Sequence, residues 1–94
     1  MINLSQKSSS EIAKEIAERV KLRRKEKKWT QQELAKRAGM SFASYKRFEQ
    51  IHEISFDSII KIAIALQMEK DFENLFSKKT FSSLAELIAS EENK

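Results

Sequence analysis

Few side chains in this chain of 94 residues could perform covalent or metal chemistry. It contains no cysteine and one histidine, His52, so we expect neither a disulfide framework nor a metal site. No nucleophile is evident for this histidine, and the lone glycine, Gly39, cannot form a phosphate-binding loop. The carboxylates are scattered along the chain. We therefore expect no catalytic residues, no cofactor and no enzymatic activity.

The basic side chains indicate a different chemistry. Residues 1–50 hold thirteen lysines and arginines against six acidic residues, whereas residues 51–94 hold five against eight. A basic half beside an acidic half indicates a polyanionic partner for the first. An ordinary solvated surface is the alternative, and cations near a helix C-terminus are favoured by the helix dipole in any case. The densest cluster comprises Arg19, Lys21, Arg23, Arg24, Lys25, Lys27 and Lys28.

Composition predicts the kind of scaffold that holds these charges. The chain has no proline and one glycine, and it is rich in Glu, Lys, Ala, Leu and Ile, which is typical of an all-α fold. Its length suits one domain. No apolar run approaches the roughly 20 residues that cross a bilayer, and the polar N-terminus is unlike a signal peptide. We expect a cytoplasmic protein without a membrane partner.

Periodicity and capping signals predict where the helices lie. Ser8 and Glu11 have capping-box spacing, and Ser55 can cap a later helix with Asp57 in its first turn. The predicted helices cover residues 8–27, 31–38, 42–50, 55–66 and 71–76. The buried stripe expected for the fourth consists of Phe56, Ile59, Ile60, Ala63 and Leu66.

Residues 30–49 predict two short helices joined by a tight turn. Gly39 suits the left-handed conformation at a helix C-terminus, Met40 would fill the turn, and Ser41 would cap the second helix. Apolar stripes on both helices flank the turn, which is typical of a helix-turn-helix unit.

This block resembles the helix-turn-helix of the phage-repressor and Xre type, and the similarity extends over roughly residues 16–66. The matching positions are Thr30, Gln31, Leu34, Ala35, Gly39, Met40, Ser41, Phe48 and Glu49. The resemblance implies an all-α, compact, five-helix lambda-repressor-like DNA-binding domain with a short C-terminal appendage, helical or extended. It also implies a homodimer bound to a palindromic operator in double-stranded DNA, since one module covers only a half-site.

By the same resemblance, the third helix carries the residues that read bases. Arg47 can donate two hydrogen bonds to guanine, and Lys46 can reach a base or the backbone. Phe42 and Ala43 would contact thymine methyl groups, although Phe42 could instead be buried in the core. The residues implied to contact phosphate are Gln31, Ser41, Ser44, Lys27, Lys28 and His52. A capping role for Gln31 and an ordinary loop position for His52 are the alternatives.

Other matching positions have structural roles. The resemblance implies a buried ion pair between Arg24 and Glu49, which removes Arg24 from the DNA-contacting set, and it places Trp29 as a core anchor. Gly39 supplies the turn.

One subgroup of the family resembles the chain in two further segments. Phe48-Glu49, with Glu53-Ile54-Ser55, and the run from Asp71 to Phe76 are similar to HipB-like regulators. These accompany HipA-family kinase toxins, so the resemblance implies the antitoxin of a toxin-antitoxin operon. The alternative is an interaction subunit whose main role is to bind and restrain a HipA-like kinase, with DNA binding secondary.

The chain is expected to divide into a flexible N-terminus (1–9), the DNA-binding domain (10–77) and a C-terminal segment (78–94). The apolar residues of that segment are Phe81, Leu84, Leu87 and Ile88. They could mediate dimerisation, fold back over the domain's own core, or dock on a kinase partner. The operator sequence and any inducer cannot be read from these residues.

Overall fold

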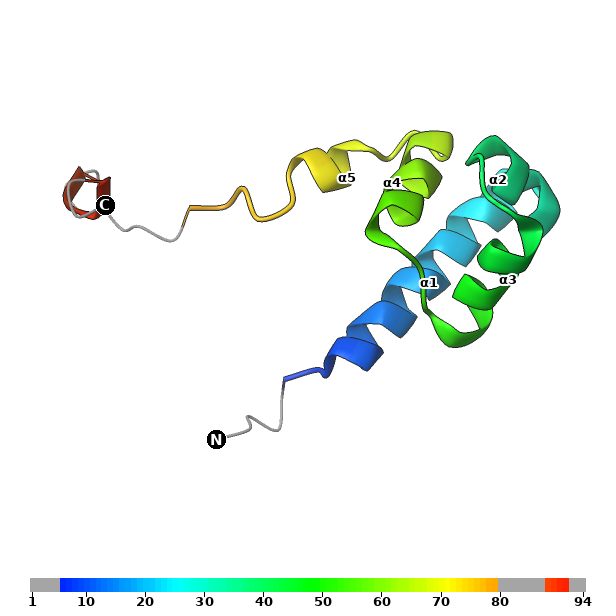
Figure 1. The fold of residues 1–94 in the computed structure, drawn as a ribbon, viewed down its shortest axis with the longest axis horizontal. Helices are drawn as coiled ribbons and strands as arrows, with labels where there is room; N and C mark the ends of the chain where they lie inside the picture. The colour runs from blue at the N-terminus through cyan, green and yellow to red at the C-terminus, as the bar shows by residue number, and fades with distance from the viewer. Residues whose placement is uncertain (1–5, 80–87, 92–94) are drawn as a thin grey trace.

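The structure, a computed structural model, describes residues 6–79 and 88–91. Over this part of the chain it is all-α, as predicted, and it has five principal helices and no strand (Figure 1). These are α1 (Ser9–Glu26), α2 (Gln31–Arg37), α3 (Phe42–Ile51), α4 (Phe56–Ala65) and α5 (Lys70–Glu73). None of the helices in the described ranges is long and apolar enough to cross a membrane.

Side-chain caps determine where the first four helices begin. The predicted Ser8–Glu11 capping box is present, and Ser41 and Ser55 accept hydrogen bonds from the backbone N–H groups of Ser44 and Ser58. Thr30 and Glu33 form a second capping box, which was not predicted. Each cap satisfies N–H groups that have no partner within the helix.

The turn between α2 and α3 has the predicted backbone. Gly39 lies in the left-handed region with a φ of 69°, where a Cβ atom would be penalised. The N–H of Met40 donates to the carbonyl of Ala35 at 3.0 Å, which closes the end of α2. The side chain of Met40 packs against the core.

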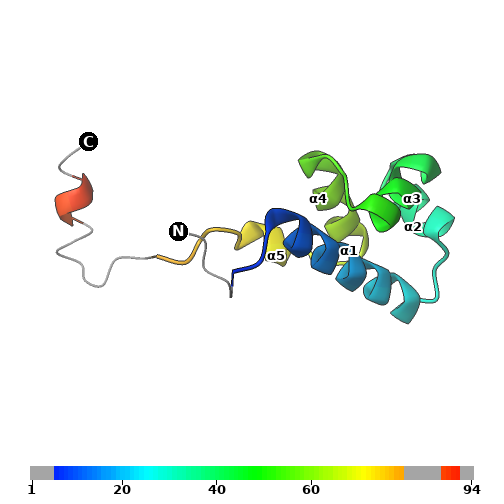
Figure 2. The same ribbon diagram turned by 90° about the horizontal axis from the view of Figure 1, so that it is seen from below.

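The core lies where α1, α2, α3 and α4 meet. α2 packs on α3 and α4, and α1 packs on α3 (Figures 1 and 2). The largest fully buried side chains are Leu34, Tyr45, Phe48 and Ile62. α5 contacts α4, on the side of the domain away from α3.

Two details of the expected packing are wrong. Phe56 is 63% exposed, because a side chain at the first helical residue points back past the helix N-terminus, where its ring meets Phe72 edge-on. α5 ends at Glu73, earlier than predicted, so Leu75 and Phe76 follow it as exposed residues. Of the C-terminal apolar residues, Phe81, Leu84 and Leu87 lie outside the described residues, and Ile88 is exposed in the helical residues 88–91.

Candidate nucleic-acid interface

The outer face of α3 carries all four predicted base-reading residues. Tyr45 and Phe48 occupy the buried side of the helix, so the residues on the opposite side of the helical wheel face outward. Phe42 is 42% exposed, which rules out the alternative that it is buried in the core. The exposed residues of this face are Phe42, Ala43, Ser44, Lys46, Arg47 and Gln50.

Arg47 occupies the middle of this face. It lines two shallow hollows, one beside Ala43 and Lys46 and the other beside Glu53 and Ser58. Its Nη2 donates to Glu53 Oε2 at 2.7 Å, and both side chains are 63% exposed. This ion pair was not anticipated, although Glu53 follows closely after α3. The guanidinium keeps its other N–H groups for an outside acceptor.

Two serines, Ser41 and Ser44, form hydrogen bonds at the N-terminus of α3. Ser41 Oγ accepts from the backbone N–H of Ser44 at 3.1 Å and donates to Ser44 Oγ at 2.8 Å. The hydroxyl hydrogen of Ser44 therefore remains for another acceptor. Together with the helix dipole, this arrangement favours an anion such as a phosphate at the start of α3.

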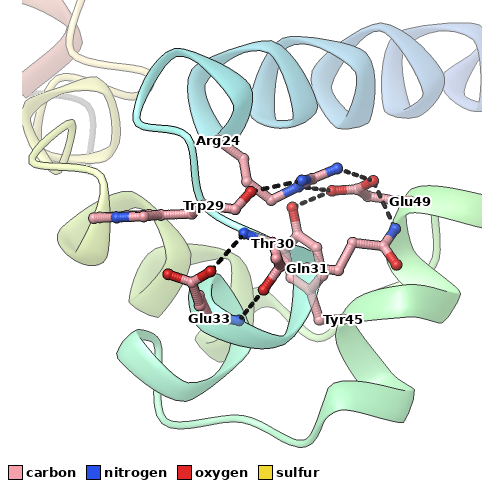
Figure 3. A network of polar contacts seen from close by, with 7 residues as sticks. All are labelled: Arg24, Trp29, Thr30, Gln31, Glu33, Tyr45 and Glu49. Carbon is pink, nitrogen blue, oxygen red and sulfur yellow. Dashed lines mark hydrogen bonds and ion pairs between the residues drawn. The ribbon is translucent and has the colours of Figure 1, made fainter.

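A buried polar network fixes α3 against α1 and α2 (Figure 3). The implied Arg24–Glu49 ion pair is present: Arg24 Nε lies 2.8 Å from Glu49 Oε2, and the side chains are 9% and 4% exposed. Arg24 also donates to the carbonyl of Trp29 at 2.8 Å. The hydroxyl of Tyr45 and the amide of Gln31 donate to the same carboxylate. Four side chains from three helices thus set the position of the outward face of α3.

The network perturbs the titration of its members. Burial alone raises the pKa of Glu49, but the hydrogen bonds from Arg24, Tyr45 and Gln31 outweigh burial, and the pKa lies below its ordinary value. The bond to Glu49 raises the pKa of Arg24. Burial and the bond to Glu49 raise the pKa of Tyr45. The pair therefore stays charged and the phenol neutral near neutral pH.

This network should make the fold sensitive to acid. Because the pKa of Glu49 is lowered in the folded state, its stabilisation is complete above the ordinary value of 4.5 and is lost as pH falls through the lower folded value. We expect the unfolding free energy, measured in urea between about pH 7 and pH 2, to fall more steeply for the natural chain than for Glu49→Gln. Equal slopes would contradict a titrating role for this carboxylate.

Four of the residues predicted to contact phosphate lie outside the start of α3, and their local environments differ. One hydrogen of the Gln31 amide is engaged by Glu49 Oε1 at 2.8 Å, so only the other remains for a phosphate. Lys27 lies over the ring of Trp29, 5.2 Å from its centroid. Lys28 and His52 have left-handed backbones, with φ values of 61° and 65°, and His52 ends α3. These four contacts remain predictions.

Trp29 has the anchoring position that was expected. It is partly buried and packs against the core, and the guanidinium of Arg37 covers its ring at 4.2 Å from the centroid. A ring held between core and cation is not available for stacking on a base.

Comparison with known protein families decides the class of the domain. Residues 20–72, from the middle of α1 into α5, match the helix-turn-helix family. The chain belongs to the helix-turn-helix family of the Xre/Cro/CI type. Searches of curated proteins and of solved structures found no significant match.

Membership of this family indicates that the domain binds DNA. α2 and α3 are the two helices of the helix-turn-helix, and α3 is the one that enters the major groove in such units. The exposed face of α3 corresponds to the surface that such units present to DNA. The polar network of Arg24 and Glu49 lies behind it, on the protein side.

Proposed function

We propose that the protein is a transcriptional repressor that binds a specific palindromic operator as a homodimer and controls its own operon. One observation carries the proposal: a helix-turn-helix of a DNA-binding family presents Lys46 and Arg47 on the open face of a helix held rigidly by a buried network. Residues 10–77 would form the DNA-binding domain and residues 78–94 the association segment.

The proposal is tested by binding to genomic fragments at several salt concentrations, followed by footprinting. Neutralised phosphates release counterions, so log K should fall linearly with log salt, with a slope of about −0.9 for each phosphate contacted. A protected palindrome with half-sites about one helical turn apart is expected. The absence of a protected site, or an affinity independent of salt, would refute the proposal.

We also propose that the chain is the HipB-like component of a toxin-antitoxin operon. The support is the second resemblance, around Glu53-Ile54-Ser55 and from Asp71 to Phe76. Co-expression with the product of the neighbouring gene should yield a stable complex with a HipA-like kinase. A DNA-binding dimer that does not retain this gene product would contradict the antitoxin role.

Glu53 should restrain DNA binding, because it competes with DNA for Arg47. Its carboxylate accepts from Arg47 and adds a negative charge beside the DNA-facing surface. An exposed ion pair contributes about 0.2–1 kcal/mol, so Glu53→Gln should tighten operator binding by about 1.4- to fivefold in a fluorescence anisotropy titration.

The matched control is Glu73→Gln, which removes the same charge on α5, away from α3. It should leave affinity nearly unchanged. Equal tightening by both variants would assign the effect to net charge, and weaker binding by Glu53→Gln would show that Glu53 positions Arg47 for the operator.

A further inference from the structure

Residues of α1, α4 and α5 line a groove. α5 lies on the side of the domain away from α3 (Figures 1 and 2). The volume of the groove is about 500 Å³. The lining is largely apolar and comes from three helices and from the residues after α5, including Ile16, Val20, Ile59, Ile62, Phe72 and Leu75. Such a hollow can accept apolar side chains from another segment.

Exposed apolar side chains surround this groove. Ile16 and Leu75 line it and are 38% and 45% exposed. Ile12 lies one turn before Ile16, and the exposed Phe56 contacts Phe72. Phe76 is 96% exposed directly after Leu75. An apolar surface of this extent is typical of an interaction site.

The C-terminal segment has the complementary chemistry. Its apolar residues recur at helical spacing, with Leu84 followed by Leu87 and Ile88. The segment, residues 78–94, holds three lysines and three glutamates, and residues 81–88 contain one charged residue, Glu86. The charged residues that line the groove are Asp71 and two arginines, Arg19 and Arg23, which already form ion pairs with Glu15 and Glu26 of α1. The match between segment and groove is therefore one of apolar character.

The path of the chain indicates which copy supplies the segment. After α5 the described chain leads away from α1 and α4, as both views show, and residues 77–79 are exposed (Figures 1 and 2). Residues 77–79 thus lead away from the groove of their own domain, which favours a groove on another copy of the chain. A two-fold axis would make the exchange reciprocal, so that each copy fills the groove of the other.

We infer that the groove between α1, α4 and α5 binds residues 81–88 of a second copy of this chain, which joins two domains by exchanged C-terminal segments. The inference rests on the proposed repressor function, which requires two α3 helices on one operator. It names the surface and the segment that pair them, and it leaves both α3 faces uncovered.

The absence of cysteine from the chain permits a direct test. Two full-length single-cysteine chains of different mass are prepared, Asn74→Cys at the groove and Ala85→Cys in the segment, then mixed, allowed to exchange subunits and treated with a short bismaleimide. We expect a covalent heterodimer by mass spectrometry. Replacing Asn74→Cys by Lys36→Cys, on the exposed surface of α2, should abolish it.

Association is measured in parallel by sedimentation of the natural chain and of Leu84→Asp/Leu87→Asp. Loss of two apolar contacts should raise the dimer dissociation constant at least about tenfold, while circular dichroism shows an unchanged domain. A monomeric natural chain would overturn the inference, as would an internal cross-link in a chain carrying both cysteines, or a groove protected only by a kinase partner.

Failure here is separable from failure of the proposed function. A chain that forms no heterodimer cross-link but still protects an operator would refute the exchanged segments and leave the repressor proposal intact. A dimer with exchanged segments that binds no DNA would support the exchange and refute the repressor proposal.

Discussion

Replacing Arg24 by alanine should destabilise the domain by about 3–5 kcal/mol, because removal of one partner from a buried ion pair leaves the other charge without compensation. Glu49 is 4% exposed and would keep only its bonds from Tyr45 and Gln31. The carbonyl of Trp29 would also lose its donor. Since small domains have total stabilities of about 5–15 kcal/mol, much of the chain could unfold at 37 °C.

The measurement is urea unfolding at neutral pH, followed by circular dichroism. Lys61→Ala is the matched control, because it removes an exposed ion pair with Asp57 at 3.0 Å, and such pairs contribute about 0–1 kcal/mol. If Arg24→Ala lowered the free energy of unfolding no more than Lys61→Ala does, the network would not be what holds α3 in place.

A double variant tests the coupling directly. Arg24→Met/Glu49→Leu removes both charges together, so its loss of stability should be smaller than the sum of the two single losses. An additive result would show that the two side chains stabilise the domain independently.

The features of the fold that could be predicted from the sequence are those that depend on residues close together in the chain. A capping box depends on two side chains three residues apart, as at Ser8 and Glu11, and a left-handed turn depends on one glycine, Gly39. Such signals can be recognised in any sequence. The Arg24–Glu49 pair joins residues far apart in the chain, and only the family resemblance implied it.

The features missed depend on how the helices pack. The bond from Gln31 to Glu49 spans 18 residues, and no local spacing predicts it. Arg47 reaches Glu53 only because α3 ends at Ile51 and the chain then turns at the left-handed His52. Phe56 belongs to an apolar stripe in the sequence, yet it is exposed, because it is the first residue of α4 and its side chain points past the helix N-terminus, which helical periodicity does not show.

Replacing Arg47 by alanine should weaken binding to the cognate operator by about 1–3 kcal/mol, or roughly five- to 150-fold, with little change on unrelated DNA. The reason is geometric: Arg47 lies on the open face of α3, and its guanidinium can donate two hydrogen bonds to one guanine. The measurement compares anisotropy titrations on the footprinted operator and on a scrambled duplex at one salt concentration.

Lys28→Ala separates base reading from phosphate binding. Lys28 is an exposed cation at the end of α1, so its loss should weaken operator and scrambled DNA alike and reduce the salt slope by about one. Arg47→Ala should instead reduce the ratio between the two duplexes, because phosphate contacts carry no sequence information. Equal losses on both duplexes for Arg47→Ala would reassign this arginine to the DNA backbone. Specificity would then have to come from Lys46, Phe42 and Ala43, the other residues of the same face.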